Sequence, residues 1–299
     1  MQCTNPQNYY PNGLFKTNKP PCGACLACLT TKRFEWASRL MLEATAHDHV
    51  QFVTLTFSPE NLPASLTPLK NIFQTWTKRL NRADHKQPRY YACMELGTQY
   101  GRPHFHALIF GRESSFETRH HNGKEYKVDP IIEDTWGHGL TYVKDCPPGQ
   151  ALANVAIYVV NYLLKNTWDS KDSDSLEWAL MSRKPYIGKP GLKWLTDVIG
   201  TKKGLQRIKH LGTIPNKVKL SGKFWMIPLR MRRELGEHFQ IPVLELPHHD
   251  NTVVDFVTHQ IIIGHPKTPQ TLGEAQANQL RLKDKITRLK RNNKSNDNG

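Results

Sequence analysis

Two histidines separated by one residue, His104 and His106, are the first candidates for chemistry, and an apolar run follows them. Side chains alternate between the two faces of a β-strand, so both imidazoles would share one face while Phe105 points to the other. Two imidazoles bind a divalent cation, and a carboxylate as third ligand favours Mg²⁺ or Mn²⁺ over Zn²⁺. Glu95, just before the turn into this strand, supplies that carboxylate in an antiparallel hairpin. The alternative interpretation is a pair of exposed histidines without a metal.

Two tyrosines four residues apart, Tyr158 and Tyr162, form the second candidate site, and Lys165 follows them. Residues four apart stack on one side of a helix, and this side lies largely away from the apolar stripe formed by Leu152, Ala156, Val159 and Leu163. A phenol near a positive charge is a nucleophile for covalent catalysis, and a metal polarises the phosphate that it attacks. With two tyrosines, one holds a strand end while the other attacks a new site. The alternative interpretation is amphipathic packing at a helix edge.

Four cysteines near the start of the sequence form a third cluster. Cys22, Cys25 and Cys28 are spaced by two residues, and Cys3 lies upstream. This set predicts a four-thiolate site, with Zn²⁺ as the natural occupant and an iron–sulfur cluster as another. The alternative is a set of reduced thiols in a loop, because the sequence has the character of a cytosolic protein.

The charge of the chain points to a polyanionic partner. The 299 residues contain 41 Lys and Arg against 26 Asp and Glu, a net charge of +15, which attracts nucleic acid from a distance. The residues expected to contact phosphates near the candidate site are Arg102, Lys78, Arg79 and Arg89. No run approaches the ~20 apolar residues of a membrane span. The N-terminus lacks the apolar core of a signal peptide, so a cytosolic location without membrane attachment is expected.

Hydrophobic periodicity predicts the elements that must position these side chains. Helices are predicted over residues 31–46, 67–80 and 151–165, and strands over residues 52–57, 89–96, 104–110 and 140–144. Residues 112–134 are predicted to be a long, polar, His-rich loop. The pattern weakens after residue 201, although residues 224–229 and 252–263 contain strand-like runs. The order of elements favours an antiparallel sheet with helices packed on one face, an α+β fold.

Several segments in this order resemble one known family. The His104–His106 motif resembles the His-hydrophobic-His motif of the HUH endonucleases, and Tyr158 to Lys165 resembles their two-tyrosine motif. The similarity is greatest to the replication initiators of microviruses, especially the gokushovirus branch of single-stranded DNA phages. Further matching segments, over roughly residues 20–190, are residues 21–25, 52–57, 97–111 and 181–188. The sequence departs from the family at Asn161, where similar proteins often carry a basic residue before the second tyrosine.

The resemblance implies an RRM-like or palm-like sheet and a mechanism. A metal on His104, His106 and Glu95 would activate the scissile phosphodiester. Tyr158 or Tyr162 would attack it, giving a 5′-phosphotyrosine and a free 3′-hydroxyl for a host polymerase, and the displaced strand would later be rejoined. The implied partners are a single-stranded DNA origin and the replication machinery of the bacterial host, helicase and polymerase, in whose cytoplasm the protein would act. The expected organisation comprises a Cys-rich segment (1–30), the HUH domain (31–200), an accessory region (201–272) and a basic tail (273–299).

Three other functions compete with this one. A related HUH transposase or plasmid relaxase is the nearest alternative, but those enzymes usually have a single tyrosine or a third histidine ligand. A noncatalytic, zinc-stabilised DNA-binding protein would use the cysteines and the basic tail, and would lose nothing when His104, His106 or Tyr158 is replaced. A phage structural protein that packages DNA has no need for a tyrosine beside a metal.

Overall fold

The computed structural model describes residues 3, 21–97, 101–147, 149–169, 179–243, 253–255 and 257–262, and only the backbone of residues 121 and 162–169. Its strands are β1 Val50–Thr56, β2 Arg89–Leu96, β3 Pro103–Phe110, β4 Glu117–His121, β5 Lys124–Val128, β6 Thr141–Asp145, β7 Ala179–Met181, β8 Lys217–Leu220, β9 Lys223–Met226, β10 Val253–Asp255 and β11 Gln260–Ile262. Its helices are α1 Leu26–Ala44, the 3₁₀ helix Pro59–Asn61, α2 Leu69–Ala83, α3 Pro130–Trp136, α4 Gln150–Asp169, α5 Gly191–Ile199, α6 Lys202–Leu211 and α7 Leu229–Phe239.

The first part of the chain builds a five-stranded antiparallel sheet in the order β6-β1-β3-β2-β7. The predicted α+β class with an antiparallel sheet is therefore confirmed. β3 occupies the centre, between β1 and β2, because its residues after His106 are apolar on both faces and are buried from Ala107 to Phe110. The strand with the two histidines is thus held on both sides by backbone ladders.

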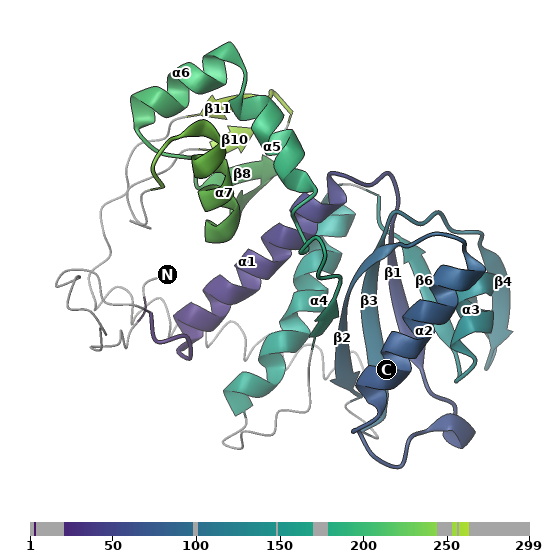
Figure 1. Ribbon diagram of the computed structural model, residues 1–299. Helices are drawn as coiled ribbons and strands as arrows, with labels where there is room; N and C mark the ends of the chain where they lie inside the picture. The colour runs from purple at the N-terminus through teal and green to yellow at the C-terminus, as the bar shows by residue number, and fades with distance from the viewer. Residues whose placement is uncertain are drawn as a thin grey trace.

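Helices cover both faces of this sheet, which differs from the predicted placement on one face (Figure 1). α2 and α3 pack on the face that contains Val53, Leu55, Ala92, Met94, Phe105, Ala107 and Ile109. α1 and α4 pack on the face that contains Tyr91, Cys93, Leu108 and Phe110. The reason is that β2 and β3 are apolar on both faces, so each face needs its own cover against water.

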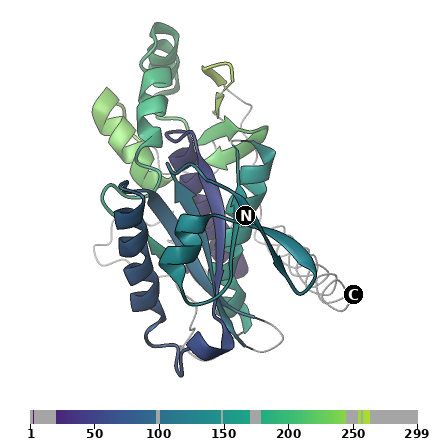
Figure 2. The ribbon, with the colours of Figure 1, turned by 90° about the vertical axis from the view of Figure 1, so that its right-hand side faces the viewer.

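The segment predicted as a long polar loop instead forms the hairpin β4–β5 and most of α3. The turn between the two strands is Asn122-Gly123, and both residues have positive φ, 49° and 73°. Asn-Gly is the preferred pair for a two-residue hairpin turn whose twist matches that of the strands, so this signal was present in the sequence. Figure 2 shows the hairpin extending beside the main sheet.

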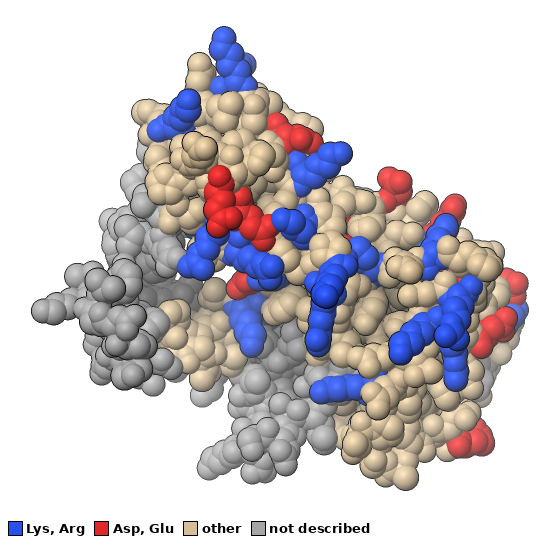
Figure 3. Space-filling model, viewed as in Figure 1, with Lys and Arg blue, Asp and Glu red and all other residues tan. Residues whose placement is uncertain are grey.

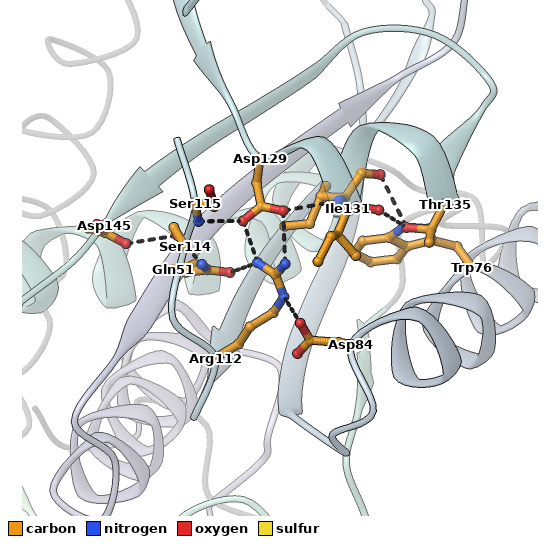
Figure 4. A network of polar contacts seen from close by, with 11 residues as sticks. Gln51, Trp76, Asp84, Arg112, Ser114, Ser115, Asp129, Ile131, Thr135 and Asp145 are labelled. Atoms are coloured by element: carbon orange, nitrogen blue, oxygen red, sulfur yellow. Dashed lines mark hydrogen bonds and ion pairs between the residues drawn. The ribbon is translucent and has the colours of Figure 1, made fainter. Parts of the chain in front are cut away.

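A buried ion-pair network anchors the end of β3 (Figure 4). The Arg112 guanidinium is 1% exposed and donates two hydrogen bonds to the Asp129 carboxylate, at 2.6 and 2.8 Å. Arg112 also donates to Gln51 of β1 at 3.3 Å and forms an ion pair with Asp84 after α2 at 3.3 Å. Asp129 caps α3 by accepting from the Ile132 N–H. The network therefore ties β1, β3, α2 and α3 together.

The later part of the chain forms a second sheet in the order β11-β10-β8-β9, surrounded by α5, α6 and α7. Its apolar residues join α1, α4 and the first sheet in one continuous core cluster, which extends from Ala37 to Ile261. The predicted boundary at residue 200 therefore falls within a stretch of shared packing, and the division into domains stays a prediction. Among the described residues, no helix has the length and apolar character to cross a membrane.

Candidate metal and nucleophile site

The pairing of three strands gathers the candidate metal ligands on one face of the sheet. Glu95 of β2 lies directly opposite His104 of β3, and Thr54 of β1 lies directly opposite His106. Because directly paired residues point to the same side, all four side chains face the layer of α1 and α4. The hairpin between β2 and β3 thus has the register that brings Glu95 beside the histidines.

His106 has a defined partner at each ring nitrogen. Its Nε2 lies 3.1 Å from Glu95 Oε2, and its Nδ1 lies 3.2 Å from the Thr54 hydroxyl. The residue is buried, and the Phe52 ring stacks on the imidazole at 5.8 Å with an interplanar angle of 6°. Thr54 and Phe52 fix the ring plane, so that Nε2 points at the carboxylate. Sequence analysis missed the role of Thr54, since a threonine in a strand carries no signal until its cross-strand partner is known.

His104 is half-buried, and its Nδ1 has no hydrogen-bond partner among the described residues. Burial lowers the pKa of His104, and the neighbouring His106 lowers it further. A neutral imidazole is the form that binds a metal. Gly97 allows His104 its position, because a Cβ on Gly97 would lie 2.9 Å from His104 Nε2. The donor set of two imidazoles and one carboxylate therefore fits a divalent cation.

Tyr158 of α4 faces this group of ligands. Its ring centroid lies 5.9 Å from that of His106 in an edge-on arrangement and 5.9 Å from that of Phe52. The side chain is 44% exposed, so the phenol is open to a substrate. Tyr162 and Lys165 lie one and two turns further along α4, in the part of the helix whose side chains are outside the described residues.

The four predicted phosphate contacts lie in different places. Lys78 and Arg79 are exposed on α2, which covers the sheet face opposite to His106. Figure 3 shows Lys and Arg side chains gathered on the side of the molecule that presents α2. Arg102 is exposed beside His104, and its charge contributes to the lowered pKa of His104. Arg89 donates to the buried carboxylate of Glu43 and to the backbone carbonyl of Pro185, so its guanidinium is engaged within the protein.

Glu43 is a fully buried carboxylate that sequence analysis did not identify. It accepts hydrogen bonds from Arg89 and from the Gly188 N–H at 2.6 Å, and it lies 3.2 Å from His47 Nε2. Burial alone raises the pKa of Glu43, but these hydrogen bonds and the Arg89 charge outweigh it and lower the pKa below its ordinary value. The ion pair connects α1, β2 and the segment before α5 and so fixes α1, on which α4 packs.

The four N-terminal cysteines converge as the sequence predicted. Their sulfur atoms all lie within 4.8 Å of one another, with Sγ–Sγ distances of 3.5 Å for Cys25–Cys28, 3.8 Å for Cys25–Cys3 and 3.9 Å for Cys22–Cys28. A tetrahedron with Zn–S bonds of about 2.3 Å has edges of about 3.8 Å, whereas a disulfide needs about 2.05 Å. The cluster can therefore bind a metal such as zinc. Within the described part of the chain, the ligand atoms of His104, His106 and Glu95 are spread more widely than these sulfurs.

Backbone groups prepare the cysteines for the thiolate form. The Cys25 N–H donates to Cys22 Sγ at 3.3 Å, and the Cys22 N–H donates to Cys3 Sγ at 3.3 Å. Hydrogen bonds from the backbone of Cys25 and Ala24 lower the pKa of the Cys22 thiol. Burial raises the pKa of Cys28, and its sulfur neighbours raise it further. In the absence of a cation, four thiolates at this spacing would repel one another, so the cluster needs a positive charge to be fully deprotonated.

Comparison with known proteins defines the class. Residues 50–167, which contain β1 to α4 with both histidines and both tyrosines, match the family model of the replication-associated protein ORF2. The chain is 26% identical over 187 residues to the Replication-associated protein VP4 of Bdellovibrio phage phiMH2K. It is 25% identical over 166 residues to the Replication-associated protein ORF4 of Chlamydia phage 1. The predicted resemblance to replication proteins of small phages is thereby confirmed.

The alignments cover part of each chain. They span 58% of this chain and 57% of the phiMH2K protein, and 52% of this chain and 40% of the Chlamydia phage protein. The chain thus spans about half the length of the curated relatives that it matches. No solved structure matches this protein. The comparisons therefore support a role in phage replication, and the chemistry has to be argued from the residues themselves.

Proposed function

We propose that this protein is a replication initiator of the HUH type, which nicks single-stranded origin DNA and remains joined to the 5′ end. One observation carries the proposal: the imidazole of His106, held between Thr54 and Glu95, lies against the exposed ring of Tyr158. A nucleophile beside a set of metal ligands is the arrangement that covalent phosphoryl transfer requires. The similarity to phage replication-associated proteins supports the same function.

His104, His106 and Glu95 are the residues that would hold Mg²⁺ or Mn²⁺. When bound, the cation polarises a phosphate oxygen and stabilises the charge that develops in the transition state. Thr54 orients the His106 ring through Nδ1 and leaves Nε2 directed toward Glu95. Partners of this kind determine the tautomer of a ligating histidine. Gly97 provides the space that His104 needs.

The Tyr158 oxygen is the proposed nucleophile that the described side chains support. After loss of its proton to solvent, it attacks the phosphorus, the bond from phosphorus to the 3′ oxygen breaks, and that oxygen takes up a proton from solvent. The products are a 5′-phosphotyrosine on the protein and a free 3′-hydroxyl, which a host polymerase extends. Tyr162 is proposed to cleave after one round, with Lys165 lowering the pKa of the phenols, and the released strand is then rejoined.

The proposed substrate is the single-stranded origin region of a phage genome, and the proposed partners are the helicase and polymerase of the bacterial host. Exposed Arg102 beside His104 would contact the phosphates, while Lys78 and Arg79 would contact DNA on the other side of the sheet. The proposed location is the cytoplasm of that host. An HUH transposase or relaxase would use the same ligands, and the circular product of rejoining distinguishes an initiator from a transposase.

The test is a denaturing gel of the protein with labelled single-stranded DNA that covers the phage genome, in the presence of Mn²⁺. We expect a covalent protein–DNA band in the wild type that disappears without metal, in His106→Ala and in the Tyr158→Phe, Tyr162→Phe double variant. The single tyrosine variants show which residue starts. Lys78→Ala is a matched control, because it removes a charge on the opposite face and should leave the adduct chemistry intact.

The absence of cleavage and adduct in the wild type, on the complete genome and with several divalent metals, would reject the nuclease. Unchanged DNA binding by the same variants would then identify a noncatalytic DNA-binding protein.

We also propose that Cys3, Cys22, Cys25 and Cys28 bind one Zn²⁺ that supports the start of α1. The sulfur spacing matches a tetrahedral zinc site, and Cys28 lies in the first turn of α1, where its position is coupled to the packing against α4. Zinc content measured by mass spectrometry should be one equivalent in the wild type and should fall in Cys25→Ser. The colour and iron content of the purified protein decide against zinc if an iron–sulfur cluster is present.

A further inference from the structure

An exposed apolar hollow of about 250 Å³ lies beside the candidate site. It is lined by Thr54, Thr56, Tyr126, Leu140, Thr141 and Tyr142. Tyr142 is 42% exposed and Leu140 is 41% exposed, although both are large and belong to the ordered sheet region. The hairpin strand β5 contributes Tyr126 and passes close to β6, so three separate segments of the chain build the hollow. Soluble proteins rarely leave such groups uncovered without a ligand that covers them.

The hollow and the candidate metal site share one row of side chains. Tyr142 of β6 lies directly opposite Thr54 of β1, and Thr54 lies directly opposite His106 of β3. All three therefore point to the same face, and Tyr142 is two strands from His106, about 10 Å. The Thr54 hydroxyl lies 3.2 Å from His106 Nδ1, so the wall of the hollow contacts a proposed ligand. Whatever occupies the hollow lies next to the reacting phosphate.

The chemistry of the lining fits a nucleobase. Tyrosine rings stack on bases of any sequence, and hydroxyls such as those of Thr54 and Thr56 are donors and acceptors for a base edge. The volume is below the roughly 300–1,000 Å³ of a site for a drug-sized molecule, so it suits one base. Lys144 is exposed on the same face, two residues beyond Tyr142, where its ammonium can reach the backbone of the strand.

We propose that this hollow is a base-binding subsite, in which an unpaired base adjacent to the scissile phosphate stacks on Tyr142. The inference rests on the proposed function, since it assigns the hollow to the same DNA strand. Its role is to fix the register of the strand, so that one particular phosphodiester faces His106 and Tyr158. Binding at the hollow is independent of the metal, because none of its lining residues is a proposed ligand.

The test is fluorescence anisotropy of labelled oligothymidylate in the presence of a chelator, with the full-length protein. Tyr142→Ala should bind about 5- to 150-fold more weakly than the wild type, the range that base stacking gives. Tyr142→Phe keeps the ring and should bind like the wild type. Phe34→Ala is the matched control: Phe34 is an aromatic residue on α1 with 40% exposure, and its loss should leave binding unchanged.

An abasic site moved along the oligonucleotide makes the test specific. At one position it should weaken binding by the wild type as much as Tyr142→Ala does, and it should have no further effect on that variant. Equal affinities of wild type and Tyr142→Ala overturn the subsite, even when adducts form with Mn²⁺. Binding that depends on Tyr142 without any adduct on the phage genome retains the subsite and rejects the nuclease. Circular dichroism of Tyr142→Ala confirms that the variant is folded.

Discussion

The contact between Thr54 and His106 allows a sharp prediction about metal binding. Thr54→Val removes one hydroxyl, replaces it with a methyl group of similar size, and leaves His106 Nδ1 without the partner that now lies 3.2 Å away. Loss of a group that orients a ligating histidine lowers metal affinity by about 10- to 100-fold, or about 1.4–2.7 kcal/mol. The effect should lie near the upper end of this range, because His106 is buried and water has little access to replace the hydroxyl.

The assay is the dissociation constant for Mn²⁺, followed by electron paramagnetic resonance of the free ion. Thr56→Val is the matched control, since Thr56 lies two residues away on the same face, but its hydroxyl donates to the Leu140 carbonyl at 3.0 Å rather than to His106. Thr54→Ser should recover most of the affinity. If Thr54→Val and Thr56→Val bind Mn²⁺ as the wild type does, the hydroxyl does not orient His106, and the argument for this site is refuted.

Three further predictions concern the support of the site. Asp129→Asn keeps the cap of α3 but leaves Arg112 buried without its counter-charge, so urea unfolding should show a loss of about 3–5 kcal/mol, and a loss below about 1 kcal/mol would contradict the network. The lowered pKa of Glu43 stabilises the fold above the pKa of the unfolded chain, about 4.3, and this contribution is lost as the pH falls through the folded pKa. Glu43→Gln should therefore be less stable than the wild type at neutral pH, with the difference shrinking in acid; an equal difference at all pH values would exclude this origin. Gly97→Ala should displace His104 and reduce the rate of adduct formation by up to about a hundredfold with little change in melting temperature, whereas an unchanged rate would show that the contact is not limiting.

Local patterns in the sequence predicted most of the elements around the site. The strands that became β1, β2 and β3 were expected close to their observed bounds, because alternating and β-branched residues carry their own signal. The hairpin β4–β5 was missed, although Asn122-Gly123 indicates its turn, since the polar composition of its strands conceals a pattern that one face alone would bury. The second sheet was also recognised only in fragments, because its strands are three or four residues long and pair across large sequence distances.

The sequence by itself determined which groups are available for chemistry: two imidazoles on one face of a strand, a carboxylate before the turn, tyrosines on a helix and four clustered thiols. Spacing within one strand or one helix fixes such relations, since the backbone repeat is the same in every protein. Only the tertiary structure decided what each group faces. Thr54, Phe52 and Tyr158 meet His106 from two other elements, and Arg89 turns to the buried Glu43 rather than to solvent. Those contacts depend on strand register and on the burial of whole faces, which are properties of the assembled core and not of any single segment.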